Sequence, residues 1–207
     1  MSKADERRKA TAEKVLDVAE RQIAGSGMSG LAMRDLANEA DCSVGTLYNL
    51  FEGLDGIILR VNSRTLSKLD RHLCSVEAGL QGEPPVKRLV ALALAYTDFV
   101  SENWRLWSAL FEHQMPEGKP IPEWHLKEHF QLFRHIVEPL SEMSPRSGEE
   151  DLLILSRNLY SAVHGMVSLG LQDRMGAIPL PRLKEQIKLF VESFTAGYAA
   201  RAAAGTI

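Results

Sequence analysis

The chain has 207 residues, a formal net charge of −3, 45% hydrophobic residues and a mean hydropathy of −0.13. A chain of this length and composition can bury a hydrophobic core without disulfides or structural metals, which excludes a disordered or fibrous protein. The two cysteines, Cys42 and Cys74, lie far apart, so the sequence has neither a secreted disulfide scaffold nor a CxxC metal or redox motif. We expect a soluble, cytoplasmic globular protein that needs no cofactor.

The sequence gives no indication of membrane insertion or export. Its longest nearly uncharged stretch, residues 89–97, has about half of the roughly twenty residues needed to cross a bilayer. The first ten residues carry charges of both signs and precede no apolar signal core. We therefore expect a core helix at residues 89–97 and no membrane partner.

Apolar residues recur at spacings of three and four along almost the whole chain, and strand-like alternation with hairpin turns is absent. This pattern predicts an all-α fold. Breaks rich in glycine and proline, such as residues 79–85, divide the pattern into separate helices. In chain order, the expected helices cover residues 5–24, 33–39, 44–50, 55–76, 86–102, 104–115, 123–140, 149–174 and 181–202.

Residues 32–51 have the pattern of a helix-turn-helix, in which two short helices meet at a tight corner. The residues spaced to bury one side of the pair are Leu36, Ala37, Ala40, Val44, Leu47 and Phe51. Asp41 and Cys42 would form the corner. Ser43 would cap the second helix by accepting a hydrogen bond from the backbone N–H of Gly45 or Thr46.

The opposite face of the second helix carries Ser43, Gly45, Thr46, Tyr48 and Asn49. Side chains of these types can reach base edges and phosphate oxygens in a major groove. Gly45 costs about 1 kcal/mol relative to alanine in a helix, which suggests that something large approaches this face closely. A plain helical corner with a solvated polar face is the alternative.

Residues 15–51 resemble the N-terminal DNA-binding domain of the TetR family of transcriptional regulators. The matching features are Ala19, Gly27, Leu31, the MRDLA run at 33–37, Ala40, and SVGTLYNLF at 43–51. The resemblance implies a three-helix DNA-binding domain at residues 1–54, with 44–50 as the recognition helix and Tyr48 and Thr46 on phosphates. The candidate contacts to double-stranded operator DNA are Arg34, Ser43, Val44, Gly45, Thr46, Tyr48 and Asn49.

Residues 159–171, LYSAVHGMVSLGL, are similar to the Trp-His-Gly type of C-terminal domain found in part of that family. His164 and Gly165 match the pattern, and Tyr160 stands near the position of the tryptophan. The similarity implies that residues 55–207 form a larger helical domain for ligand binding and dimerisation. Apolar stripes on the last two helices predict that some of their surface faces another subunit; they include Leu152, Leu155, Leu159, Val163, Leu183, Ile187, Phe190 and Phe194.

Three residues depart from the family pattern. Ala32 replaces the usual threonine that caps the first helix of the pair, and Asp41 replaces the usual glycine of the turn. Leu54 replaces a lysine, which removes an expected phosphate contact. Residues 1–64 contain nine Lys and Arg against ten Asp and Glu, so few salt contacts and a shallow salt dependence of DNA binding are expected.

Positive charge gathers near the N-terminus, at Lys3, Arg7, Arg8 and Lys9. These residues could form an arm over phosphates or in the neighbouring minor groove. A solvated tail, balanced by two nearby carboxylates, is an equal alternative.

Residues 96–133 contain all three tryptophans and most of the aromatic residues. Such a cluster can line an apolar cavity for a small molecule, or it can simply be core. We expect a largely apolar or aromatic effector, with His113, His125, His129 or His164 as candidate polar groups. The candidate ligand-binding residues are Tyr96, Trp104, Trp107, Phe111, Trp124, Phe130, Phe133 and His164.

His125 and His129 stand at i and i+4, so both could face one zinc ion, with Glu128 or His113 nearby. Two histidines on an exposed helix face are more often ordinary surface residues, and Leu126 excludes an HExxH motif. We therefore expect no metal site.

An enzyme is the competing class of function. The chain lacks a P-loop, a GxGxxG motif, a GxSxG elbow and an evident nucleophile beside His164. The sequence instead predicts a ligand-released repressor that binds a palindromic operator as a homodimer. Control by a protein partner, or a small-molecule binding protein that does not bind DNA, are the alternatives.

Overall fold

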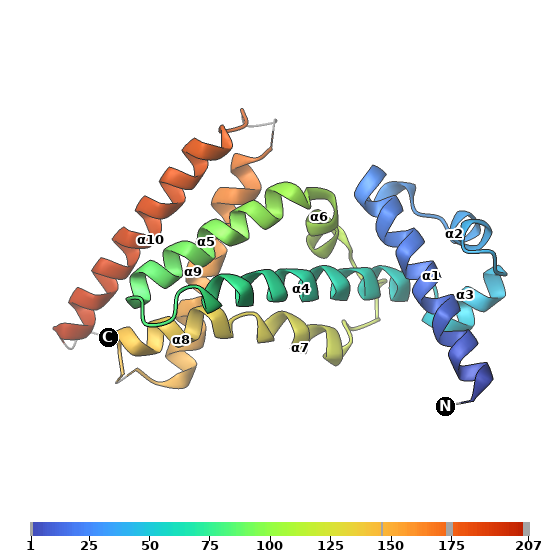
Figure 1. Ribbon diagram of the computed structural model, residues 1–207, viewed down its shortest axis with the longest axis horizontal. Coiled ribbons are helices and arrows are strands. Elements are labelled where there is room, and N and C mark those ends of the chain that lie inside the picture. The colour runs from blue at the N-terminus through green and yellow to red at the C-terminus, as the bar shows by residue number, and fades with distance from the viewer. Residues whose placement is uncertain (1, 146, 173–175, 205–207) are drawn as a thin grey trace. The chain divides into compact units, whose positions relative to one another are not determined.

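The computed structural model describes residues 2–145, 147–172 and 176–204, and these residues form helices and loops without strands (Figure 1). The predicted all-α fold is confirmed. The helices are α1 (Lys3–Ser26), η1 (Met28–Gly30), α2 (Met33–Glu39), α3 (Val44–Phe51), α4 (Leu54–Ala78), α5 (Pro85–Glu102), α6 (Trp104–Glu112), α7 (Glu123–Gln131), α8 (Arg134–Met143), α9 (Glu149–Gly170) and α10 (Leu180–Ala203). None of these described helices is both long and apolar enough to span a bilayer.

The chain folds as two compact units. The first unit comprises the residues up to Lys68 together with Asn103–Leu126, and the second comprises Leu69–Glu102 together with the residues from Lys127 onward. Helix α4 contributes its N-terminal part to the first unit and its C-terminal part to the second. The expected functional boundary after residue 54 falls inside the first unit.

The core of the first unit is formed by one side of each of α1, α2, α3 and α6 and of the N-terminal part of α4. Helix α1 begins with a capping box between Ser2 and Asp5 and ends at Gly27, where φ is +78°. Full burial of an aliphatic side chain contributes about 1.5–3 kcal/mol, so this shared core holds the short helices α2 and α3 in place. Its buried residues include Val15, Ala19, Ile23, Leu36, Leu47, Ile57, Val61, Leu106 and Ala109.

In the second unit, α5 packs against α8, α9 and α10. Helices α9 and α10 approach each other closely at Gly170, which ends α9. A Cβ atom at this position would lie 2.9 Å from Cδ1 of Leu183, so a larger residue would require the Leu183 side chain to shift.

The expected helix over residues 123–140 is wrong, because the structure divides it into α7 and α8. Around the break, the N–H groups of Phe133 and His135 bond to carbonyls three residues earlier, those of Phe130 and Leu132. These tighter bonds turn the chain, and Phe133 then packs edge-on to Tyr160, with ring centroids 5.5 Å apart. Tertiary packing thus outweighs the continuous helical pattern.

Two helices end earlier than predicted. Helix α6 ends at Glu112 rather than near residue 115, because His113 adopts an extended backbone with ψ of 121°. Helix α9 ends at Gly170 rather than near residue 174; residues 173–175 lie outside the described part of the chain.

The apolar stripes expected to face a second subunit are largely core residues of the second unit. Leu152, Leu159, Val163, Leu183 and Ile187 are all buried within it. The same two helices expose other large apolar side chains. These are Leu153, Ile154, Leu169 and Leu189.

Candidate functional site

Helices α2 and α3 meet at a tight corner as the sequence predicts. Asp41 adopts the left-handed conformation, with φ of +57°, and the N–H of Cys42 donates to the carbonyl of Ala37 at 2.9 Å. Ser43 caps α3, because its Oγ accepts from the N–H of Thr46 at 3.1 Å. Ala32 gives α2 no side-chain cap.

One face of α3 is fixed in the core, and the opposite face is exposed. Leu47 and Phe51 are buried, and Val44 is partly buried against the same core. Because Val44 was expected both to pack inward and to contact DNA, the structure supports the first role for its side chain. Tyr48 is 57% exposed, and Asn49 beside it is also exposed.

The N-terminal end of α3 presents small groups. Ser43 and Gly45 are exposed, and Thr46 is partly exposed with its Oγ1 2.9 Å from Oγ of Ser43. A Cβ atom on Gly45 would meet only Oγ of Ser43, at 3.7 Å. Packing within the protein therefore does not require glycine there, and the bare backbone leaves room for an external partner. Arg34 lies exposed in the first turn of α2.

The basic residues near the N-terminus belong to α1, which begins at Lys3. The capping box of Ser2 starts the helix ahead of these residues, so they lie in its first turns, and their contact with phosphates stays a prediction. Arg8 extends toward the recognition helix, where its Nη2 donates to the carbonyl of Asn49 at 3.2 Å. The charge of Arg8 thus lies beside the exposed face of α3.

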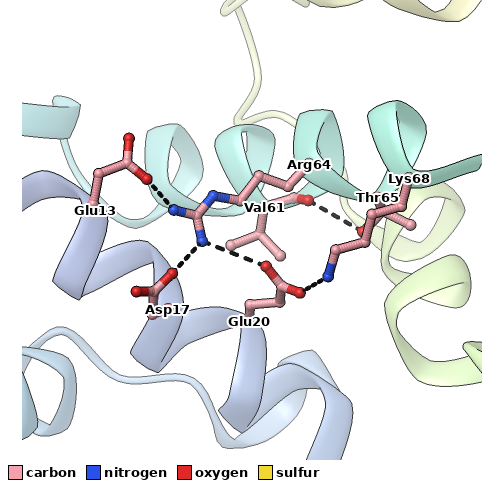
Figure 2. A network of polar contacts seen from close by, with 7 residues as sticks. All are labelled: Glu13, Asp17, Glu20, Val61, Arg64, Thr65 and Lys68. Atoms are coloured by element: carbon pink, nitrogen blue, oxygen red, sulfur yellow. Dashed lines mark hydrogen bonds and ion pairs between the residues drawn. The ribbon is translucent and has the colours of Figure 1, made fainter. Parts of the chain in front are cut away.

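A network of ion pairs joins α1 to α4 (Figure 2). Arg64 of α4 contacts three carboxylates of α1: Glu13, Asp17 at 2.7 Å and Glu20 at 3.4 Å. Lys68 contacts Glu20 as well. Burial opposes the charge of Arg64, but the hydrogen bonds that its guanidinium donates to Asp17 and Glu13 outweigh this and raise its pKa. The network fixes the N-terminal part of α4 against α1, the helix on which α2 packs.

Sequence reasoning did not identify this network. The three acidic residues stand at i, i+4 and i+7, so they share one helix face. That spacing was a usable signal, although it did not indicate the partner in α4.

Two family models match the chain. The model of the bacterial regulatory proteins of the tetR family matches residues 15–61, and that of the tetracyclin repressor-like C-terminal domain matches residues 89–194, which is half of the chain. The chain belongs to the TetR family. It is therefore a transcriptional regulator with a DNA-binding helix-turn-helix and a ligand-binding C-terminal domain, and this membership agrees with the expectation that it is not an enzyme.

Several solved structures share the fold. The regulatory protein SCO4313 is 20% identical with a TM-score of 0.70, over 90% of this chain and 97% of that chain. A TetR transcriptional regulator from Rhodococcus sp. RHA1 is 16% identical with a TM-score of 0.60, over 90% and 96%. RolR in complex with resorcinol is 15% identical with a TM-score of 0.65, over 96% and 93%. The comparison with curated proteins gives no match.

Four of the candidate ligand-binding residues lie in the second unit of this TetR regulator. Oη of Tyr96 lies 2.7 Å from Nδ1 of His164. Tyr160 stacks on His164, with centroids 5.6 Å apart, and Phe133 packs edge-on to Tyr160. Phe130 is 48% exposed, 6.3 Å from the ring of Phe133. Sequence reasoning left Tyr160 out of the candidate ligand-binding residues, although it had noted its position near the family's tryptophan.

Burial sets the protonation of this cluster. It raises the pKa of Tyr160 to about 12 and lowers the pKa of His164 below its ordinary value. The phenol and the imidazole are therefore both neutral near pH 7. The cluster offers hydrogen bonds without charge inside an aromatic surround.

The other four candidates, Trp104, Trp107, Phe111 and Trp124, lie in the first unit. Trp107 is only 2% exposed and packs edge-on to Phe111, with centroids 5.5 Å apart. The guanidinium of Arg60 lies 4.1 Å from the ring centroid of Trp124. Trp107 therefore belongs to the core of this unit.

The remaining candidate histidines have separate surroundings. His125 is buried beside Trp124 rather than on an exposed helix face as expected, while His129 is partly exposed. His113 lies with Nε2 3.6 Å from Asp55. Burial lowers the pKa of His113 more than this carboxylate raises it.

Proposed function

We propose that this TetR regulator is a cytoplasmic repressor that binds a palindromic operator as a homodimer and is released by a small, largely apolar ligand. The observation that carries the proposal is the division of α3 into a buried apolar face and an exposed polar face. A short helix anchored in this way can enter a major groove without unfolding any part of its own unit.

Recognition of the operator would use the exposed face of α3. Asn49 can form two hydrogen bonds to an adenine edge, while Tyr48 and the capped N-terminus at Ser43 suit phosphate oxygens. Arg34, from the first turn of α2, would add a further phosphate contact. In this arrangement Asn49 supplies sequence preference, and the other groups set the register.

A homodimer would present two copies of α3. The exposed apolar residues of α9 and α10, including Ile154 and Leu189, favour association with a second copy of the same surface. Twofold symmetry then implies two half-sites about one helical turn apart, roughly 34–36 Å.

The ligand would bind near Tyr96, Tyr160 and His164. A molecule with an aromatic body and a hydroxyl group could replace the neutral hydrogen bond between Tyr96 and His164. RolR, a structural neighbour, was crystallised with resorcinol, which makes simple phenols the first compounds to test. Such a ligand lowers DNA affinity only as far as it prefers the conformation with poor operator affinity.

The proposal is tested by selecting DNA fragments from a random pool with the purified full-length protein. We expect enrichment of one palindromic sequence with the half-site spacing given above. Binding of the selected DNA should then be measured by fluorescence anisotropy, with and without phenols. Enrichment of no sequence would contradict operator binding, and tighter binding with ligand would contradict release.

A further inference from the structure

Three metal-ligating side chains converge in the second unit, on helices α4 and α8. Asp70 and Cys74 lie one turn apart on α4, and His135 comes from α8. One ligand atom from each lies within 4.8 Å of the others, and Nε2 of His135 is 2.9 Å from Oδ1 of Asp70. Zinc bonds of about 2.0–2.3 Å require ligand atoms roughly 3.3–3.8 Å apart. A side-chain movement of about 1 Å would therefore bring the three to binding distance.

The carboxylate of Glu77 lies next to Nδ1 of His135, the ring nitrogen that does not face Asp70. The imidazole of His135 is only 2% exposed, and its Nδ1 lies 2.8 Å from Oε2 of Glu77, although the two groups are not aligned for a straight hydrogen bond. A carboxylate behind one ring nitrogen orients a histidine and makes its other nitrogen a stronger ligand. Here that other nitrogen, Nε2, points to Asp70.

The guanidinium of Arg134 already lies between Asp70 and Cys74. Nη2 of Arg134 is 2.5 Å from Oδ1 of Asp70 and 3.7 Å from Sγ of Cys74. Because the Arg134 side chain is 49% exposed, it can move into water and leave this position to another cation.

We propose that Asp70, Cys74 and His135 bind one zinc ion, with water in the fourth position. A thiolate and an imidazole favour zinc over magnesium or calcium, which prefer oxygen ligands alone. The ion replaces Arg134 and links α4 to α8. Glu77 is a positioning residue that acts through His135. This site is separate from the proposed phenol site and does not depend on the proposed function.

The first test is titration of the reduced full-length protein with Co²⁺, a coloured substitute for zinc. We expect a thiolate-to-cobalt charge-transfer band that saturates at one equivalent per chain and disappears when Zn²⁺ is added. Cys74→Ser should abolish the band, whereas the matched control Cys42→Ser should retain it. Absence of the band in the natural protein, or its persistence in Cys74→Ser, would overturn the proposal.

Two further variants separate a ligand site from a merely structural role. Glu77→Gln should weaken Co²⁺ affinity by about 10–100-fold, since it removes the carboxylate behind the imidazole. Arg134→Gln should strengthen Co²⁺ binding, since the competing cation is removed. Circular dichroism confirms that each variant is folded before titration. Unchanged affinity in Glu77→Gln together with weaker binding in Arg134→Gln would also reject the site.

Discussion

Asn49 and Tyr48 are neighbours on the exposed face of α3, but we expect different roles for them. Asn49→Ala should remove about 1–3 kcal/mol of preference for one operator base pair, because its amide is the group suited to a base edge. Tyr48→Ala should weaken binding to all sequences alike. The measurement compares operator, singly substituted operator and random DNA. Asn38→Ala, at an exposed position on α2, is the control, and equal losses of Asn49→Ala on all three DNAs would contradict its role.

Ala32 offers a stabilising change at one residue. It has the extended backbone of an N-cap, with φ of −132° and ψ of 138°, but no side-chain oxygen that can accept from the first backbone N–H groups of α2. Ala32→Ser should raise the free energy of unfolding by about 1 kcal/mol, and Ser43→Ala should lower it by a similar amount. Urea denaturation followed by circular dichroism measures both. The prediction requires that the free energy of unfolding rises in one variant and falls in the other. A fall in both variants would mean that alanine is needed at position 32 for another reason.

The lowered pKa of His164 predicts how the stability of the protein changes as the pH falls. Burial lowers this pKa below the ordinary 6.5, so the unfolded chain binds this proton more readily than the folded one. The contribution of neutral His164 to the free energy of unfolding is therefore complete above pH 6.5. It is lost as the pH falls through the pKa that His164 has in the folded state. His164→Gln should make stability less sensitive to pH between about 7.5 and about 5.5. Unfolding curves at several pH values test this, and a slope that stays the same in His164→Gln would contradict it.

At the scale of elements, the ion pairs of Arg64 connect α4 to α1. Arg64→Met should destabilise the protein by about 1 kcal/mol, because it leaves three carboxylates facing one another without their shared cation. The loss should shrink in high salt, which screens that repulsion. Denaturation at low and high salt is the measurement. Arg21→Met is the control, because the pair of Arg21 with Glu39 is much more exposed; equal effects would show that the Arg64 network has no special weight.

Sequence patterns predicted those elements that are determined by residues close to one another in the chain. The corner of the helix-turn-helix followed from Asp41 and Ser43, which set a turn and a cap within a few residues. The break between α7 and α8 could not be predicted in this way, because Phe133 turns there to pack on Tyr160. Contacts of Arg64 likewise join distant parts of the sequence. Spacing alone identifies a face of a helix, but it does not identify the partner of that face.

At the scale of the whole molecule, dimerisation can be tested through residues that the protomer leaves exposed. Ile154 is 50% exposed and Leu189 is 56% exposed, so charging them should not disturb the core. Ile154→Lys with Leu189→Lys should give monomers in sedimentation and should lower operator affinity at least tenfold, since both half-sites must be held together. Ile121→Lys, at a 47% exposed apolar position in the first unit, is the control. Dimers that persist in the double variant would place the interface elsewhere.

Acidic and basic residues are nearly balanced in residues 1–64, and this balance affects how strongly the regulator would bind genomic DNA outside its operator. Asp41, exposed at the corner before α3, adds a negative charge where a polyanion would approach. Attraction to phosphates is the main source of sequence-independent binding, so bulk genomic DNA would retain few molecules. Most copies would stay free to sample operators, so the proposed repressor would need few copies to keep its operator occupied.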